Sequence, residues 1–149
     1  MYFCTVKTMG RIIGIDYGRK RVGLAVTDPL RMFASPLITV NVQEFDSYIE
    51  EYLESEQIDE FVVGYPVGMN NQPSESVKYI DPFIRRLKKK FPGMPVHLVD
   101  ERFTTKMALR TMIDGGVRKK ERQNKMIADM ISASIILQSF LDGKANQKK

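Results

Sequence analysis

Two apolar segments joined by a short turn, near the start of the chain, constrain its fold more than any other feature. Arg11–Asp16 has the sequence RIIGID, Val22–Asp28 has VGLAVTD, and the turn between them contains YGRK. Short apolar runs on either side of a glycine-containing turn are typical of two antiparallel strands. A third strand is predicted over Leu37–Val42, directly after Pro36. The first third of the chain is therefore expected to form a three-stranded antiparallel meander.

The second of these segments has one face made only of small side chains. Successive side chains of a strand point to opposite faces, so Gly23, Ala25 and Thr27 share one face and three larger residues share the other. A strand face without bulky side chains lets a helix or a ligand approach the backbone closely. We therefore expect a helix or a ligand to pack tightly on this face.

The remainder of the chain alternates between helical and strand patterns. Apolar spacing and capping residues predict helices over 45–53, 74–90, 104–113 and 126–141. Short apolar runs predict buried strands over 61–64 and 95–99. A meander followed by such crossovers forms an α/β fold in which a mixed five-stranded sheet carries helices on both faces.

Length and composition place these elements in one domain. The 149 residues suffice for a single domain over 1–149, with a core over about 11–141 and a flexible tail expected over 143–149. Cys4 is the single cysteine, so no intrachain disulfide can form and a reducing compartment, the cytoplasm, is expected. No stretch approaches the roughly 18 apolar residues of a membrane span, so no membrane association is predicted.

Three acidic residues occupy positions that indicate a functional site. Asp16 ends the first predicted strand and Glu101 follows the last, so both belong to the sheet edge where ligands of such folds bind. Asp129 lies in a helix of otherwise apolar or small residues, where an unpaired carboxylate would cost several kcal/mol. Its partner is either Lys125, one helical turn earlier, or a metal ion. Asp16 could instead serve only its turn, and Glu101 could cap the next helix.

Carboxylates that converge from separate elements are suited to phosphodiester hydrolysis. This reaction requires an activated water and positive charge beside the attacking and leaving oxygens, and two Mg²⁺ or Mn²⁺ ions about 4 Å apart supply both. Hard cations of this kind prefer carboxylate ligands. We therefore predict a two-metal site in which Asp16, Glu101 and Asp129 are both metal ligands and catalytic residues.

Positive charge is concentrated beside these acids. Lysine and arginine number 23 against 18 acidic residues, which gives a formal net charge of +5. Two clusters flank the predicted site and are expected to contact phosphates, namely Arg19, Lys20 and Arg21 in the first turn and Arg118, Lys119 and Lys120 in the loop over 117–124. A third cluster, over 85–90, is sufficiently explained as a solvated helix face.

Four sequence blocks, spread over nearly the whole chain, are specific when taken together. They are GIDYGRKRVGLAVTD at 14–28, VVGYPVGMN at 62–70, VDERFTT at 99–105 and KMIADMISASIILQSFL at 125–141. In this order they resemble the YqgF family, whose members are named as Holliday junction resolvases or pre-16S rRNA nucleases. The resemblance implies an RNase H-like fold and a nuclease activity, with catalytic acids at Asp16, Glu101 and Asp129.

The resemblance also implies supporting residues and shows one departure. It implies that Arg102 holds the scissile phosphate and that Lys125 assists in binding the substrate. Enzymes of the wider RNase H and RuvC-type group often take an acid from the strand at 61–64, but this chain has VGYP at 63–66. Glu101 is therefore expected to supply the second carboxylate.

These features favour a metal-dependent endonuclease that processes the 5′ end of pre-16S rRNA in ribosome biogenesis. Its expected partners are structured RNA or branched DNA and ribosomal precursor particles, with the chain itself a monomer or a weak homodimer. Two alternatives stay open, a Holliday junction resolvase in DNA recombination and repair and a non-catalytic nucleic-acid-binding factor. A phosphotransferase of the actin and sugar-kinase superfamily has a similar first hairpin, but such enzymes need two domains and this chain provides one.

Overall fold

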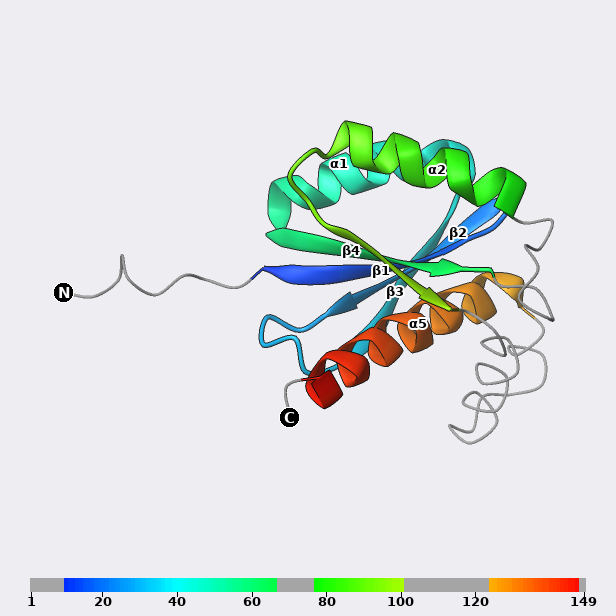
Figure 1. Ribbon diagram of the computed structural model, residues 1–149. Coiled ribbons are helices and arrows are strands. Elements are labelled where there is room, and N and C mark those ends of the chain that lie inside the picture. Colours follow the sequence, from blue (N-terminus) through cyan, green and yellow to red (C-terminus); the bar gives the residue numbers. More distant parts are fainter. Residues whose placement is uncertain (1–9, 67–76, 101–123, 148–149) are drawn as a thin grey trace.

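The computed structural model describes residues 10–66, 77–100 and 124–147, the last four by their backbone only. Five strands form one sheet in the order β3-β2-β1-β4-β5 (Figure 1). They are β1 (Arg11–Tyr17), β2 (Arg21–Thr27), β3 (Ala34–Asn41), β4 (Ile58–Tyr65) and β5 (Val96–Asp100). β1 pairs antiparallel with β2, and β2 with β3, whereas β4 runs parallel to both β1 and β5. The predicted mixed five-stranded sheet and its N-terminal meander are confirmed.

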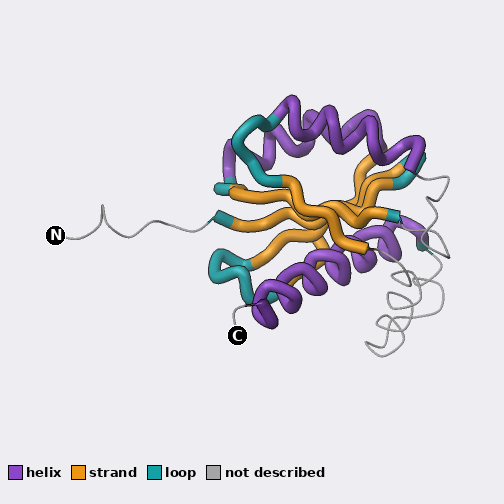
Figure 2. Tube along the Cα trace, in the orientation of Figure 1, coloured by secondary structure: helices purple, strands orange, loops and turns teal. Residues whose placement is uncertain are grey.

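Helices cover both faces of the sheet, as the sequence predicted. α1 (Phe45–Ser55), which follows the short 3₁₀ helix η2 (Val42–Glu44), lies with α2 (Val77–Lys90) on one face. α5 (Lys125–Gln147) crosses the other face (Figure 1, Figure 2). The helix predicted over 104–113 lies outside the described residues.

The alternation of side chains along the strands divides the core into two clusters. Val22, Leu24 and Val26 belong to the cluster beneath α1 and α2. Ala25 belongs to the other cluster, where it packs with Ala133 and further apolar residues of α5. The predicted division of β2 into a face of larger residues and a face of small residues is therefore confirmed, and each face has its own helical layer.

α5 approaches β1 and β2 so closely that two strand positions require glycine. A Cβ on Gly23 would lie 2.1 Å from the backbone oxygen of Asp129, and a Cβ on Gly14 would lie 2.7 Å from the Cβ of Leu137. Non-bonded carbon atoms gain their best contact at about 3.5–4.0 Å, so any side chain at these two positions would push the helix away. The small-residue face of β2 thus admits a helix, and it brings the backbone at Asp129 down onto the sheet.

α5 is long and apolar enough, by length and composition alone, to cross a membrane over Lys125–Gly143. The expectation that no segment reaches this limit is therefore wrong. Ala133, Ile136 and Leu137 are buried against the sheet, which is how a core helix uses its apolar face.

Several element boundaries differ from those predicted: β4 begins at Ile58 rather than at 61, and two further differences have a clear physical reason. β3 begins at Ala34, before Pro36 rather than after it. It is an edge strand, and its pairing with β2 shifts register beside Pro36, so a residue without an N–H group is accommodated. α5 runs past the predicted end at Leu141 to Gln147, because the single Gly143 weakens a helix by only about 1 kcal/mol.

At the sheet edge where β1 begins, ion pairs join β4 to the turn between β2 and β3. Arg31 Nη2 lies 2.7 Å from Asp59 Oδ2, and Arg31 Nη1 lies 3.1 Å from Glu60 Oε2. The Gly10 N–H donates to Asp59 at 2.8 Å. Partial burial raises the pKa of Asp59, but the hydrogen bonds from Gly10 and Gln57 and the charge of Arg31 outweigh it and hold that pKa below its usual value.

Asp59→Asn is expected to destabilise the protein at neutral pH and to have less effect in acid. A carboxyl group whose pKa falls on folding stabilises the folded state above its unfolded pKa of about 4, and this contribution is lost as the pH falls through the folded pKa. Because the ion pair is partly exposed, we expect a loss of about 1 kcal/mol in the free energy of unfolding at neutral pH. Urea unfolding at neutral pH and near pH 3 measures the difference, and an equal loss at both would contradict its electrostatic origin.

Candidate active site

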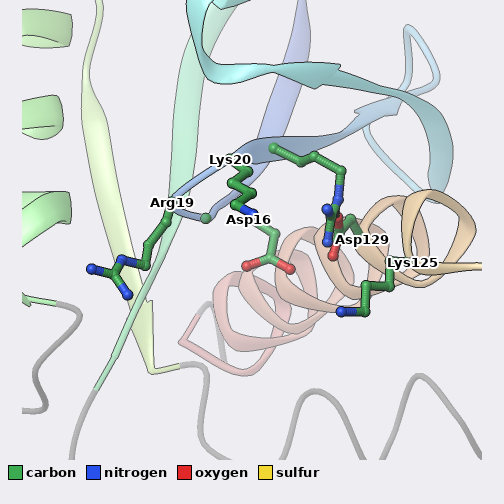
Figure 3. Close-up of a pocket in the computed structure, with 7 residues that line it drawn as sticks. Asp16, Arg19, Lys20, Lys125 and Asp129 are labelled. Atoms are coloured by element: carbon green, nitrogen blue, oxygen red, sulfur yellow. Dashed lines mark hydrogen bonds and ion pairs between the residues drawn. The ribbon is translucent and has the colours of Figure 1, made fainter.

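A pocket of about 360 Å³ lies at the sheet edge where β1 ends (Figure 3). Two carboxylates, four cationic side chains and one glycine line it, namely Asp16, Asp129, Arg19, Lys20, Arg21, Lys125 and Gly18. The sequence predicted all six of the charged residues as members of one site. They come from three parts of the chain: the end of β1, the turn into β2, and the beginning of α5.

The turn between β1 and β2 holds the basic residues at the rim of this pocket. The Gly18 N–H donates to the Arg21 carbonyl at 2.9 Å, which closes the turn. A Cβ on Gly18 would lie 2.8 Å from the same oxygen, so this close approach requires glycine. Arg19 and Lys20 therefore sit at the tip of a tight, fixed hairpin.

Strand register and helix packing bring the two carboxylates to one side of the sheet. Asp16 lies directly opposite Gly23 on β2, and Gly23 is the residue against which the backbone of Asp129 packs. Directly opposed residues of antiparallel strands point to the same face, with Cα atoms about 5 Å apart. Figure 3 shows the carboxylates of Asp16 and Asp129 on this shared side, over α5.

Asp129 forms an ion pair with Arg21. Its Oδ2 lies 2.9 Å from Arg21 Nε, and the two side chains are 27% and 30% exposed. Among the described residues, Arg21 lies within ion-pair distance of Asp129, whereas Lys125, one of the two partners considered from the sequence, lines the same pocket without pairing with it. Tertiary packing explains this pairing. Because α5 lies across the start of β2, Arg21 is closer to Asp129 than Lys125, which is one turn away on the same helix.

The start of α5 is fixed beside the pocket by two hydrogen bonds. The Thr39 hydroxyl of β3 donates to the Met126 carbonyl at 2.5 Å. The Asn124 side chain accepts a hydrogen bond from the Met126 N–H at 2.9 Å, as a helix N-cap does. These contacts hold the first turn of α5, and with it Lys125, at the pocket.

Tyr79 on α2 is a residue of this region that the sequence analysis did not single out. The Arg19 guanidinium lies over its ring, 4.5 Å from the ring centre, and also donates a hydrogen bond to its hydroxyl. Stacking of this kind restrains a long, flexible side chain. Tyr79 lies 60 positions further along the chain than Arg19, and no local pattern indicates such a contact.

β4 and β5 end at the same edge of the sheet as β1. Ile15 pairs with Val63 on β4, and Tyr65, two residues later, pairs with Asp100 at the end of β5. The sequence expectation that the first and last strands end together is confirmed. β5 is two strands from β1, about 10 Å away.

Five of the predicted site residues lie outside the described part of the chain, namely Glu101, Arg102, Arg118, Lys119 and Lys120. Within the described part, no group of three or more histidine, cysteine, aspartate or glutamate side chains could hold a metal ion. Asp16 and Asp129 are therefore two of the three predicted ligands, and the position of Glu101 stays a prediction.

β4 contributes no acid beside Asp16. Val63 of β4 pairs with Ile15 of β1. The next residue on each strand is Gly64 and Asp16, so Gly64 lies beside Asp16. β4 ends in glycine and tyrosine, so this position has no carboxylate, as the sequence indicated. Tyr65 instead donates a hydrogen bond to Asp81 on α2 at 2.8 Å, and this bond raises the pKa of the tyrosine.

Known proteins resemble this chain over nearly its full length. The family model RuvX, described as Holliday junction resolvase, matches residues 10–143. A Bacteroides fragilis protein named "Putative pre-16S rRNA nuclease" is 51% identical over 136 residues, which cover 91% of this chain and 99% of that protein. A protein of the same name from Parabacteroides distasonis is 50% identical over 139 residues, which cover 93% and 99%.

Solved structures of much lower identity share the fold. One is the Fowlpox virus resolvase in complex with Holliday junction DNA, with a TM-score of 0.57 at 10% identity, covering 90% of this chain and 98% of that one. Another is Thermus thermophilus RuvC with a Holliday junction substrate, with a TM-score of 0.53 at 17% identity, covering 91% and 96%. At such identities the likeness concerns the fold alone, and it confirms the RNase H-like fold expected from the sequence.

The family resemblance drawn from the four sequence blocks is confirmed, since those blocks lie within the region that the family model matches. Relatives named as nucleases, a family of resolvases and a shared fold all point to an enzyme that hydrolyses phosphodiester bonds. This chain belongs to the RuvX family of Holliday junction resolvases, also called YqgF.

Proposed function

We propose that this protein is a divalent-metal-dependent endonuclease that cuts RNA at the 5′ end of pre-16S rRNA, in the cytoplasm. One observation carries the proposal: Asp16 and Asp129 enter one pocket from separate elements, and four cationic side chains surround them. Carboxylates converging in this way suit a divalent cation, and cations around them suit a phosphate backbone. The names of the 45–51% identical relatives support the RNA substrate.

The residues in the pocket fit a divalent cation by their chemistry. Carboxylate oxygens are the ligands that Mg²⁺ and Mn²⁺ prefer. Asp16 and Asp129 would hold the ions, with Glu101 as the predicted third ligand. When bound, two such ions would supply the activation of water and the positive charge that phosphodiester hydrolysis requires.

The cationic residues would have different roles in binding the substrate and in orienting the acids. Lys20 and Lys125 line the pocket and would bind phosphate oxygens of the substrate strand. Arg21 orients Asp129 through their ion pair, and Arg19 is restrained by Tyr79 at the rim. Arg102 and the loop residues Arg118, Lys119 and Lys120 would extend the phosphate contacts, and ribosomal precursor particles would present the RNA.

A DNA four-way junction is the second candidate substrate, since the description of the matching family names it. Cleavage of a pre-16S rRNA 5′ fragment and of a four-way junction, side by side with Mg²⁺ and with Mn²⁺, tests the choice. We expect metal-dependent cutting of the RNA that Asp16→Asn abolishes. Cutting of the junction alone would refute the RNA assignment, and no cutting of either substrate would favour a non-catalytic binding factor.

Neutralising Lys20 and Lys125 together is expected to weaken nucleic-acid binding and to flatten its salt dependence. Each phosphate contact contributes roughly 0.7–0.9 to the slope of log affinity against log salt, so the double alanine variant should lose about 1.5–2 from that slope. Fluorescence anisotropy with a labelled RNA at several salt concentrations measures this slope.

By the same reasoning, neutralising Arg118, Lys119 and Lys120 should lower the slope of log affinity against log salt by up to about 3.

Lys88 and Lys89 provide a matched control for this measurement. Both are exposed in the last turn of α2, whose C-terminal end lies at the opposite edge of the sheet from the pocket. Their double alanine variant carries the same change in net charge. If it flattens the salt dependence equally, the pocket lysines act only through overall charge.

A further inference from the structure

A second cavity, of about 330 Å³, adjoins the candidate active site. It is lined by Arg19, Lys20, Asn41, Val42 and Gln43. Arg19 and Lys20 also line the first pocket, so the tip of the β1–β2 hairpin is a wall common to both cavities. A substrate strand that crosses this tip would meet one cavity directly after the other.

Backbone pairing fixes the second cavity relative to Asp129. Asn41 pairs with Arg21, whose guanidinium binds Asp129. The Val42 N–H donates to the Lys20 carbonyl at 3.0 Å, so the two walls of the cavity are joined directly. The backbone positions on the two sides of the second cavity are therefore set by strand geometry.

Side-chain alternation places Asn41 on the same face of the sheet as the acids. Thr39 points toward α5, because its hydroxyl donates to the Met126 carbonyl. Asn41 is two residues further along the same strand and therefore belongs to the same face. Its cross-strand neighbour Arg21 also turns to this face, where it binds Asp129.

We propose that the second cavity binds an unpaired nucleobase next to the phosphate held in the active site, with adenine preferred. This inference rests on the proposed nuclease function and names a specificity site for it. A side-chain amide has two N–H donors and an acceptor oxygen, so Asn41 and Gln43 can each pair with a base, although one Asn41 N–H donates to Glu44 Oε1 at 3.5 Å. Such an amide matches the donor and acceptor pair of the adenine edge. Val42 supplies an apolar contact for the ring, and Arg19 and Lys20 hold the phosphate between the two cavities.

The composition and size of the cavity distinguish a base from other ligands. The described residues that line it include no carboxylate, which a divalent cation would require. They include two exposed amide side chains, of Asn41 and Gln43, and one apolar side chain, of Val42. The volume is at the lower end of the range for small-molecule sites, which suits a single base rather than a duplex. A base reaches such a pocket only when it is unstacked, so the substrate is single-stranded at this nucleotide.

The test measures binding without divalent metal, so that no cleavage occurs. The probe is an RNA hairpin with a single-stranded 5′ extension, whose stem fixes the register, and an abasic site replaces each extension nucleotide in turn. For the wild type we expect one position at which loss of the base lowers affinity about tenfold, and at that position adenine should bind best. In the variant N41A/Q43A, affinity for the intact RNA should fall by a similar factor, and the dependence on position should disappear.

Gln57→Ala provides the control, because it removes an amide near the opposite edge of the sheet, where Gln57 precedes β4. It should leave the positional dependence intact. Equal affinity of the wild type for all abasic RNAs, or a positional dependence that persists in N41A/Q43A, would overturn the inference. Failure of the nuclease proposal is a separate result: the base effect would be present in binding, while the rRNA precursor would stay uncut with Mg²⁺ and Mn²⁺.

Discussion

Asp129→Asn is expected to lower cleavage at least about 100-fold while the protein remains folded. Loss of residues that only support metal ligands typically costs 10–100-fold, so loss of a proposed ligand should cost more. The substitution keeps the shape of the side chain and removes the charge that the metal ions would offset. Initial rates on the rRNA precursor with saturating Mg²⁺, for wild type and variant, measure the loss.

The stability of Asp129→Asn provides a second test of the role of Asp129. Arg21 would keep a hydrogen bond to the asparagine oxygen but lose its charged partner, so the free energy of unfolding should fall by about 1 kcal/mol. Millimolar Mg²⁺ or Mn²⁺ should raise the Tm of the wild type and have a smaller effect on the variant, because a ligand that binds the folded state stabilises it. Because Arg21 already pairs with Asp129, a modest loss of stability alone does not separate a structural from a catalytic role.

Asp142→Asn is the matched control for Asp129→Asn. Asp142 lies on the same helix, is exposed, and accepts a hydrogen bond from Gln138 at 3.1 Å. Its substitution removes the same charge far from the pocket and should leave cleavage unchanged. Full activity of Asp129→Asn would show that Asp129 serves only as the partner of Arg21, and the metal site would then have to be placed elsewhere.

Gly23→Ala is expected to destabilise the protein strongly. The new Cβ would lie 2.1 Å from the backbone oxygen of Asp129 and 2.4 Å from its carbonyl carbon. Neither atom can rotate away, so α5 must shift, and overpacking of this kind costs about 3 kcal/mol. For a domain of this size the Tm should fall by roughly 6–12 °C. Cleavage should fall as well, because the shift moves Asp129 relative to Asp16.

Gly143→Ala separates steric conflict from a general effect of replacing glycine. A Cβ at Gly143 on α5 would meet no atom within 4 Å. This variant should gain roughly 0.5–1 kcal/mol, because alanine restricts the unfolded chain and favours the helix. Thermal unfolding of both variants measures the contrast. If Gly23→Ala were as stable as the wild type, the close packing of α5 on β2 would be wrong.

The strands and the N-terminal meander could be predicted because their signals are local. The alternation in VGLAVTD divides β2 into two faces whatever surrounds it, and a glycine-containing turn closes the first hairpin. Asp16 could be placed at a ligand-binding edge because it precedes that turn at the end of a strand. The start of β3 could not be placed correctly, since the register shift that tolerates Pro36 depends on the partner strand.

Six of the eleven predicted site residues lie together in one pocket, but the contacts among them could not be predicted. Six charged residues chosen from their sequence positions line one pocket. The pairing of Arg21 with Asp129 could not be foreseen, because helical spacing offered Lys125 and gave no information on residues 108 positions away. The contact of Arg19 with Tyr79 has the same origin, since α2 reaches the site edge through a crossover that local patterns do not orient.

The sequence by itself determined the mixed sheet, the small-residue face of β2 and the charged residues that the site contains. These depend on side-chain alternation, turn chemistry and composition, which are properties of neighbouring residues. Only the tertiary structure decided which cation holds Asp129, and that Asn41 and Gln43 line a cavity beside the site. The ion pair of Asp129 depends on how closely α5 packs onto Gly14 and Gly23, and the cavity depends on the register between β2 and β3. Both the packing and the register are set by contacts between residues far apart in the chain, which local sequence patterns do not contain.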